Sequence, residues 1–306
     1  MAPPAAPAPA AHAAAPLPWA GLALAVAGSV AFSGKTIIVK LAYRHGVDAV
    51  TLIMYRMLFA LPFFVALAWW AGRGRARLTR HELLVVAGLG FSGYYISSFL
   101  DFLGLQYVSA SLGRLIQYLN PTLVLFLSAL LFHQRISGAK LAALAVSYAG
   151  VLLVFGHEIR FAGAQTALGA ALVFGSAVTY AVYLVASGAA VKRLGALRLT
   201  GWASSVACVL CLLQFVLLRP LSAADVAPEV VWLSLLNGTL CTVAPVLLVM
   251  MAIERIGAPL TAQTGMIGPL STIAMGVLIL GETFNGWIVA GTALVLTGVW
   301  LLARAR

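Results

Sequence analysis

The chain has 306 residues, of which 62% are hydrophobic and only 9% are charged. A soluble domain carries about 25% charged residues, so this composition excludes a water-soluble globular protein and indicates that lipid surrounds most of the surface. The net charge of +11 could suggest nucleic-acid binding, but the cations lie in loops between apolar runs. We therefore expect an all-α membrane protein in a lipid bilayer, with no nucleic-acid partner.

Residues 1–18 are almost entirely Ala and Pro. Such a segment cannot build a core, so we expect a disordered tail there. It also lacks the positively charged start of a signal peptide, so we expect no cleavage.

Ten apolar runs follow the tail, and each is long enough to cross a bilayer as a helix. Backbone groups cannot be left unsatisfied in lipid, so runs of this length predict helices and not barrel strands. We expect ten transmembrane helices, at about residues 19–41, 49–70, 82–106, 109–132, 138–155, 167–190, 199–218, 229–253, 258–280 and 285–303.

The basic residues predict the orientation of these helices. With a cytoplasmic N-terminus, twelve of the 19 Lys and Arg residues fall on the cytoplasmic side. Cytoplasmic loops carry the excess of Lys and Arg in membrane proteins. We therefore expect both termini in the cytoplasm of a bacterium and a multi-pass location in its inner membrane. The remaining cations are Arg44, Arg160 and Arg219 on the far side, and Lys35, Lys40, Arg56 and Arg114 within helices.

The second half of the chain repeats the first at an offset of 148 residues, as in Pro121 and Pro269 or Gly150 and Gly298. We expect a first repeat at 19–156, a linker at 157–165 and a second repeat at 166–304, each with five helices. Because five is odd, the second repeat enters the membrane from the opposite side. Inverted repeats build secondary transporters, whose substrate site lies near the midplane between the halves.

Several short motifs lie at matching places in this pattern. They are Lys40 closing the first run, Arg56 in the second, Tyr107 and Ser109 at the third turn, Asn120-Pro121, Gly268-Pro269 and Gly281-Glu282. In this order, over residues 19–303, they resemble the drug/metabolite transporter superfamily, in particular its EamA-type members with two inverted five-helix repeats. The first repeat has His133-Gln134 where the second has Gly281-Glu282, which departs from the usual Gly-Glu of that family.

Within that superfamily the chain is most similar to bacterial amino acid exporters of the YddG type. The resemblance implies export of amino acids, including aromatic ones, from the cytoplasm through a central cavity by a single subunit. We expect no cofactor.

Charged residues within helices are costly in a bilayer and are functional candidates. Asp101 and Arg114 lie at equal depth on either side of the turn near Tyr107, and we expect them to pair. The pair could form a gate or contact the substrate, or it could simply lock two helices together. If paired, Asp101 stays ionised and is a poor proton carrier.

Lys35, Lys40, Arg56 and Arg114 make the outer half of the first repeat electropositive. This region could draw a carboxylate outward or anchor a gate, while Lys40 could instead cap its helix and extend toward the membrane surface. Glu282, on the same outer side, could neutralise one of these cations.

A set of polar and aromatic residues is expected near the midplane, where they could line the substrate cavity or join helices. The set comprises Ser33, Tyr94, Tyr95, Ser98, Gln117, Tyr118, Asn120, Tyr180, Tyr183, Asn237, Gln263 and Thr264. Pro121 and Pro269 would each remove a backbone hydrogen bond, so we interpret them as paired hinges or as tolerated kinks.

No catalytic constellation is present, so we predict that the chain is not an enzyme. Gly88, Gly90 and Gly93 spell GxGxxG inside an apolar helix with no strand before it, which disfavours a dinucleotide site. Cys208 and Cys211 form a CxxC in an apolar run with no nearby His, which indicates packing and no metal site.

We therefore expect a carrier that exports amino acids or related small metabolites by alternating access. No His falls at mid-membrane depth, which favours facilitated movement; a proton-coupled drug or metabolite exporter is the alternative. An intramembrane enzyme would need a catalytic dyad, and a receptor or structural subunit would not need an inverted repeat.

Overall fold

In the computed structural model, the described residues are 19–131, 133, 137–162, 164–265 and 267–304. They form helices joined by short loops and turns, with no strand among them. The expected tail at 1–18, the residue Gln134 of the His133-Gln134 pair and the side chain of Gln263 lie outside the described part of the chain.

The first half of the chain forms α1 to α7. Their bounds are α1 Trp19–Tyr43, α2 Ala49–Gly72, α3 Arg80–Leu89, the π-helical η1 Gly90–Ile96, α4 Ser97–Gly104, α5 Ala110–Gln117, α6 Asn120–Leu131 and α7 Gly138–Ala162.

The second half forms α8 to α13. Their bounds are α8 Ala164–Leu194, α9 Ala196–Leu218, the 3₁₀ turn η2 Leu221–Ala224, α10 Pro228–Gly238, the π-helical η3 Thr239–Val243, α11 Ala244–Thr264, α12 Ile267–Met275, the π-helical η4 Gly276–Leu280 and α13 Gly286–Arg304.

Eight of the described helical segments are long and apolar enough to cross a membrane, and two shorter apolar helices, Ile267–Leu280 and Gly286–Leu302, follow them. Several expected boundaries differ. Helix α7 continues to Ala162, past its expected end at residue 155, so most of the expected linker at 157–165 is helical. A loop was expected between residues 253 and 258, but α11 continues through this segment to Thr264. The guanidinium of Arg255 donates to the backbone oxygen of Met251, one turn earlier on the same helix. This charged residue therefore lies within a continuous helix.

Side-chain caps fix several helix starts. Asp48 accepts hydrogen bonds from the backbone N–H groups of Val50 and Thr51 at the start of α2. Thr79 and Glu82 form a capping box at α3. Each cap satisfies backbone donors that the first turn of a helix leaves without a partner.

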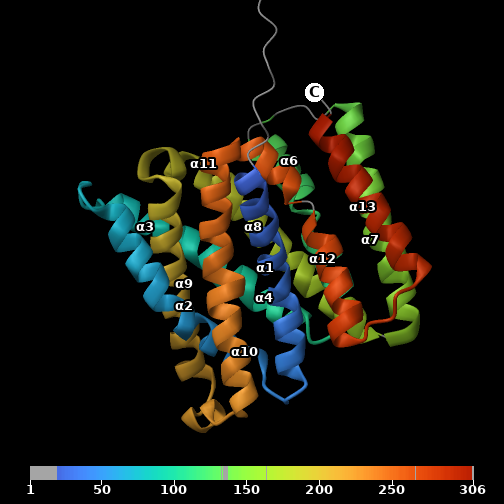
Figure 1. The fold of residues 1–306 in the computed structure, drawn as a ribbon, viewed down its shortest axis with the longest axis horizontal. Coiled ribbons are helices and arrows are strands. Elements are labelled where there is room, and N and C mark those ends of the chain that lie inside the picture. The colour runs from blue at the N-terminus through green and yellow to red at the C-terminus, as the bar shows by residue number, and fades with distance from the viewer. Residues whose placement is uncertain (1–18, 132, 134–136, 163, 266, 305–306) are drawn as a thin grey trace, which may run out of the picture.

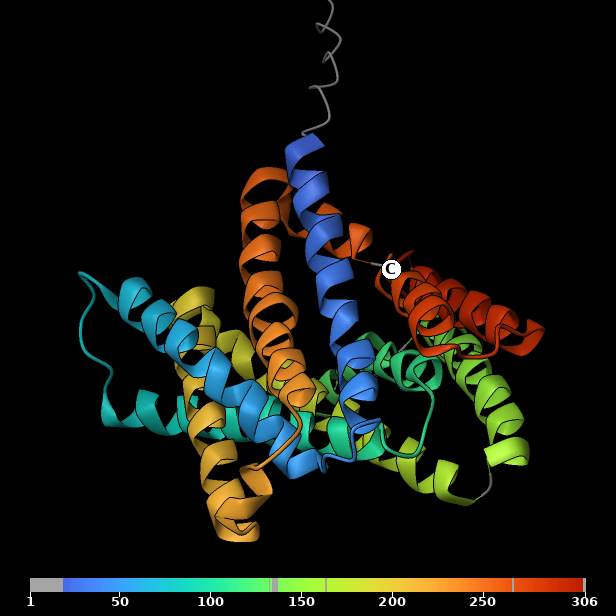
Figure 2. The same ribbon diagram turned by 60° about the horizontal axis from the view of Figure 1, so that its bottom comes forward.

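The main helix pairs each join one helix from the first half of the chain to one from the second half. α2 packs on α9, and α7 packs on α13. Helix α1 packs on α11, and at an offset of 148 residues this contact corresponds to the packing of α8 on α4. Figures 1 and 2 show α7 and α13 together at one side of the bundle and α2 and α9 at the other, with α1 and α11 between them. The two halves therefore interlock through equivalent contacts.

Two glycines allow equivalent close approaches between the halves. A Cβ added to Gly90 in η1 would lie 2.5 Å from the backbone oxygen of Ala203 in α9. A Cβ added to Gly238, 148 residues later, would lie 2.7 Å from the backbone oxygen of Arg56 in α2. Both distances are too short for any side chain. Each glycine precedes or begins a π-helical segment, where one extra residue per turn re-aims the following side chains.

Candidate functional site

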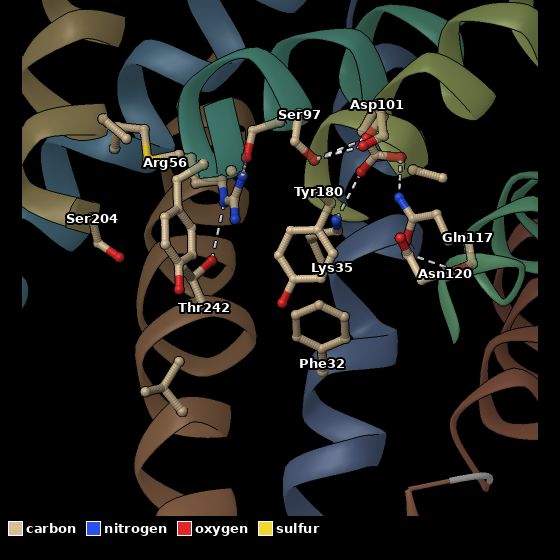
Figure 3. A pocket seen from close by; sticks show the side chains of 18 of the residues that line it. Phe32, Lys35, Arg56, Ser97, Asp101, Gln117, Asn120, Tyr180, Ser204 and Thr242 are labelled. Carbon is tan, nitrogen blue, oxygen red and sulfur yellow. Dashed lines mark hydrogen bonds and ion pairs between the residues drawn. The ribbon is translucent and has the colours of Figure 1, made fainter. Parts of the chain in front are cut away.

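A cavity of about 310 Å³ lies at the centre of the bundle, within the range of small-molecule sites. Helices from both halves of the chain enclose it, and Figure 3 shows its polar side chains converging on the same space. It is lined by Phe32, Lys35, Arg56, Met57, Phe64, Gly93, Tyr94, Ser97, Ser98, Asp101, Arg114, Gln117, Tyr118, Asn120, Pro121, Ser176, Ala177, Tyr180, Ser204, Ala207, Thr242 and Val246.

One face of η1 and α4 supplies four of the lining side chains. Tyr94, Ser97, Ser98 and Asp101 have the spacing i, i+3, i+4 and i+7, which places them on one side of a helix. The hydroxyl groups of Ser97 and Ser176 are 3.1 Å apart, which joins α4 to α8. This face is polar because it points into the cavity and away from lipid.

Asp101 pairs with Lys35 across the cavity wall. The ammonium of Lys35 donates to the carboxylate of Asp101 at 2.7 Å, and both side chains are buried. The side-chain amide of Gln117 donates to the other carboxylate oxygen. The predicted pairing of Asp101 with Arg114 was therefore wrong. Equal depth on two helices does not fix the direction of the side chains, and Lys35 on α1 occupies the position beside Asp101.

Arg114 is buried without an ion-pair partner among the described carboxylates. Its guanidinium lies 5.1 Å from the ring centroid of Phe32 and 5.2 Å from that of Tyr118. One nitrogen donates a long hydrogen bond of 3.4 Å to the hydroxyl of Ser33, and Nε has no hydrogen-bond partner. The guanidinium also hydrogen-bonds to the hydroxyl of Tyr118, so aromatic faces and hydroxyl groups, and no described carboxylate, stabilise the positive charge.

Arg56 is the second buried cation without a described carboxylate partner. Its Nε donates to the hydroxyl of Thr242 at 3.0 Å, and one terminal nitrogen lies 3.5 Å from the hydroxyl of Ser98. The guanidinium also lies 5.1 Å from the ring centroid of Phe102. Since Lys35 and Asp101 neutralise each other, Arg56 and Arg114 leave the described lining with a net positive charge.

Three tyrosines form an aromatic wall. The rings of Tyr94 and Tyr183 meet edge to face at 5.0 Å, with their hydroxyl oxygens 3.1 Å apart, and Tyr180 stacks on Tyr183 at 5.6 Å. The wall continues into a second cavity of about 430 Å³. Tyr94, Tyr180, Phe32, Arg114 and Val246 line both cavities, so the two spaces meet at these residues.

Paired helix interruptions flank the cavity. The helix of α5 ends at Gln117 and resumes as α6 at Asn120, while α11 ends at Thr264 and α12 begins at Ile267. Pro121 and Pro269 lie in the first turn after each interruption, where a missing N–H costs least. Pro121 lines the cavity, whereas Pro269 is buried and lies outside its lining.

A second polar cluster lies near the C-terminal end of α1. Glu282 accepts hydrogen bonds from the backbone N–H groups of Ala110 at 2.6 Å and Ser111 at 3.3 Å, at the start of α5. Glu158 accepts from the backbone and the hydroxyl of Ser109. Lys40 is close enough to interact electrostatically with both carboxylates. These contacts join the end of α7 and the loop before α13 to the start of α5.

Several predicted site residues line the cavities. Tyr94, Ser98, Gln117, Tyr118, Asn120 and Tyr180 line the first, Tyr183 lines the second, and Lys35, Arg56, Asp101 and Arg114 also line the first.

Other predicted residues lie elsewhere. Ser33 donates to the backbone oxygen of Gly268, Tyr95 packs against Phe91, and Asn237 donates to the backbone oxygen of Lys35. Thr264 and Lys40 are outside the cavity linings, as is Glu282.

Sequence reasoning missed the small and apolar lining residues. Ser97 was recognisable from the periodicity of Tyr94, Ser98 and Asp101. Phe32, Phe64, Ser176, Ser204 and Thr242 carry no comparable signal, because Phe and small polar residues are common throughout membrane helices. Within the described residues, no group of three or more His, Cys, Asp or Glu side chains could hold a metal ion.

Comparison with known proteins gives one family. The sequence model of the EamA-like transporter family matches twice, over residues 19–156 and 167–304. The chain is 29% identical over 270 residues to a protein of Bacillus subtilis (strain 168) described as "Uncharacterized transporter YcbK", and the match covers 86% of each chain. A solved structure described as "Crystal structure of protein" has a TM-score of 0.64 at 19% identity, covering 92% of this chain and 98% of the other. That likeness concerns the fold alone.

Proposed function

Because the chain belongs to the EamA-like transporter family, we propose that this multi-pass membrane transporter exports amino acids or related small metabolites from the bacterial cytoplasm across the inner membrane. The observation that carries this proposal is the central cavity, in which two buried arginines without described carboxylate partners face an aromatic wall. A buried cation without a counter-ion is costly, so such a site favours a ligand with a carboxylate. The aromatic wall suits an apolar side chain.

Both functional groups of an amino acid have possible partners in the lining. The guanidinium of Arg114 suits a carboxylate, since it presents several N–H donors in one plane. For the ammonium, the side-chain oxygen of Asn120 is an acceptor without a hydrogen-bond partner, whereas the carboxylate of Asp101 is already paired with Lys35. The hydroxyl of Ser204 is a further polar group of the lining.

The proposed topology has ten membrane crossings in two inverted repeats, with both termini in the cytoplasm. The distribution of Lys and Arg supports it. The packing between the halves also supports it, because the contact of α1 with α11 and the contact of α8 with α4 are equivalent at the repeat offset. In Figure 1 the start of α1 and the end of α13 lie toward the same end of the bundle, as an even number of crossings requires.

Alternating access is the proposed mode of transport, and the structure is interpreted as inward-facing. The second cavity is lined by Gly28, Ser29 and Val191, which lie toward the N-terminal, cytoplasmic end of α1 and the C-terminal end of α8. At the opposite end, Glu282 and Glu158 hold the start of α5. The outward-facing state would require the contacts of Glu282 to break while the second cavity, at the cytoplasmic end, closes. The paired interruptions near Asn120 and Ile267 are the proposed hinges.

Counterflow tests this function. The full-length protein is reconstituted alone in liposomes, which are loaded with an unlabelled amino acid and diluted into the labelled one without any ion gradient. We expect transient accumulation of labelled Thr, Met or Phe, because a facilitative carrier exchanges its substrate across the membrane. Absence of accumulation for every amino acid would overturn the proposed cargo.

Proton coupling distinguishes the alternative exporter. Asp101 is the one described carboxylate that lines the first cavity, and it forms an ion pair with Lys35. This pairing favours uncoupled transport by a single subunit. Uptake driven by an imposed pH gradient would instead support a proton-coupled drug or metabolite exporter.

A further inference from the structure

The charge of the cavity suggests a narrower class of cargo. Four charged side chains among the described residues line it, namely Lys35, Arg56, Arg114 and Asp101, and the exposed fraction of each residue is 7% or less. The carboxylate and the ammonium of one pair, Asp101 and Lys35, cancel at 2.7 Å. Two guanidinium charges remain, so a zwitterion, whose own charges cancel, would leave both uncompensated.

The surroundings of Arg114 leave its donors available to a ligand. Aromatic rings cover the guanidinium on the sides of Phe32 and Tyr118, whereas a carboxylate approaches a guanidinium through its N–H edge. Among the described residues, the hydroxyls of Ser33, at 3.4 Å, and of Tyr118 are its hydrogen-bond partners, and Nε is without a partner. By contrast, Arg56 has a hydrogen bond of 3.0 Å to Thr242. Arg114 is therefore the better candidate for direct contact, and Arg56 adds positive potential.

Arg114 is also placed where the two cavities meet, since it lines both. Gly268 leaves room for it: a Cβ at this position would lie 2.9 Å from a terminal nitrogen of Arg114 and 2.6 Å from the hydroxyl oxygen of Tyr118. Tyr94 and Tyr180 of the aromatic wall line the same two cavities. A ligand can therefore touch the guanidinium and the aromatic wall together.

We propose that the cavity selects an organic carboxylate of net negative charge with an aromatic or apolar body, in preference to the zwitterionic amino acid of the same shape. This proposal rests on the proposed transport function and narrows its cargo to carboxylic acids related to amino acids, such as those that lack the amine or carry it acylated. Arg114 binds the carboxylate. An added ammonium is disfavoured because it enters a region of positive potential.

Calorimetric binding to the purified full-length protein at pH 7 tests the proposal with three ligands of similar shape. They are 3-phenylpropionate, phenylalanine and 2-phenylethylamine, whose net charges are −1, 0 and +1. We expect 3-phenylpropionate to bind about tenfold or more tightly than phenylalanine, and 2-phenylethylamine to bind least. Equal or tighter binding of phenylalanine would overturn the proposal, as would the absence of 3-phenylpropionate binding.

Three variants test the assigned contact. Arg114→Gln should weaken 3-phenylpropionate binding about 10- to 100-fold, the range for a lost hydrogen bond to a charged group. Arg73→Gln removes the same charge from an exposed residue stacked on Trp69 and should leave binding unchanged. Gly268→Ala keeps every charge but displaces Arg114, so it should also weaken binding and serves if Arg114→Gln fails to fold. Unchanged binding in a folded Arg114→Gln variant, or in Gly268→Ala where Arg114→Gln does not fold, would contradict the contact.

The outcome is distinguishable from a failure of the proposed function. If phenylalanine shows counterflow but 3-phenylpropionate does not bind, amino acid transport stands and the selectivity for anions falls. If 3-phenylpropionate binds in an Arg114-dependent way but no amino acid shows counterflow, the anion site stands and the proposed amino acid cargo falls.

Discussion

The ammonium of Lys35 lies 2.7 Å from the carboxylate of Asp101, with both side chains buried beside the central cavity. This contact joins α1 to α4. The two charges of this pair cancel, so Arg56 and Arg114 determine the sign of the net charge of the lining.

The buried pair makes a prediction about stability. Asp101→Asn should lower the free energy of unfolding by about 3–5 kcal/mol, because it leaves the Lys35 ammonium buried without a counter-ion. Thermal unfolding in detergent measures the change. The double variant Lys35→Met/Asp101→Leu should lose less, since it buries no charge at either position. A double variant less stable than Asp101→Asn would argue against this explanation.

The close approach at Gly90 predicts a position-specific loss of stability. Gly90→Ala places a Cβ 2.5 Å from the backbone oxygen of Ala203, and we expect it to lower the stability by about 1–3 kcal/mol through overpacking. Gly88→Ala is the matched control, because a Cβ at Gly88 would meet nothing within 4 Å. Equal melting temperatures for the two variants would show that α9 can move away at little cost.

The contacts of Glu282 predict a role in holding the start of α5. Glu282→Gln should destabilise the protein by about 1.5–3 kcal/mol, the range for lost hydrogen bonds to a charged group. Glu229→Gln is the control, because Glu229 is an exposed acid in the first turn of α10. Thermal unfolding compares the two, and a larger effect at Glu229 would contradict the assigned contact.

Asp48 predicts a dependence of stability on pH. Partial burial acts to raise the pKa of Asp48, but hydrogen bonds from Thr51 and Arg219 outweigh it and hold the pKa below its usual value of 3.8. A lowered pKa in the folded state means that the stabilisation is present above pH 3.8 and is lost as the pH falls through the lower folded value. Asp48→Asn should therefore be less stable than the natural protein at pH 7, and the difference should shrink below pH 3.8. A difference independent of pH would exclude this origin.

The sequence predicted the helical membrane fold and much of the polar lining, and the reason is the bilayer. A charged or amide side chain in an apolar run must face the interior, so Asp101, Arg114 and Gln117 were recognisable as site candidates. All three line the central cavity. The family match over 19–156 and 167–304 agrees with two copies of one unit.

Side-chain partners were not predictable in the same way. The depth of Asp101 and Arg114 in the membrane follows from counting residues, but the partner depends on the rotation of each helix. Helix α1 brings Lys35 to Asp101, while Phe32 and Tyr118 face Arg114. The continuation of α11 to Thr264 was missed because a charged residue, Arg255, interrupts the apolar run, although its guanidinium bonds to its own helix.

The central claim is that the cavity around Arg114 is the transport site, and counterflow by matched variants tests it most directly. The natural protein, Arg73→Gln and Arg114→Gln are reconstituted in equal amounts, and accumulation of the same labelled substrate is followed in each. We predict that Arg73→Gln accumulates label like the natural protein and that Arg114→Gln loses at least about nine-tenths of the initial rate. Equal accumulation by a folded Arg114→Gln variant would contradict the claim.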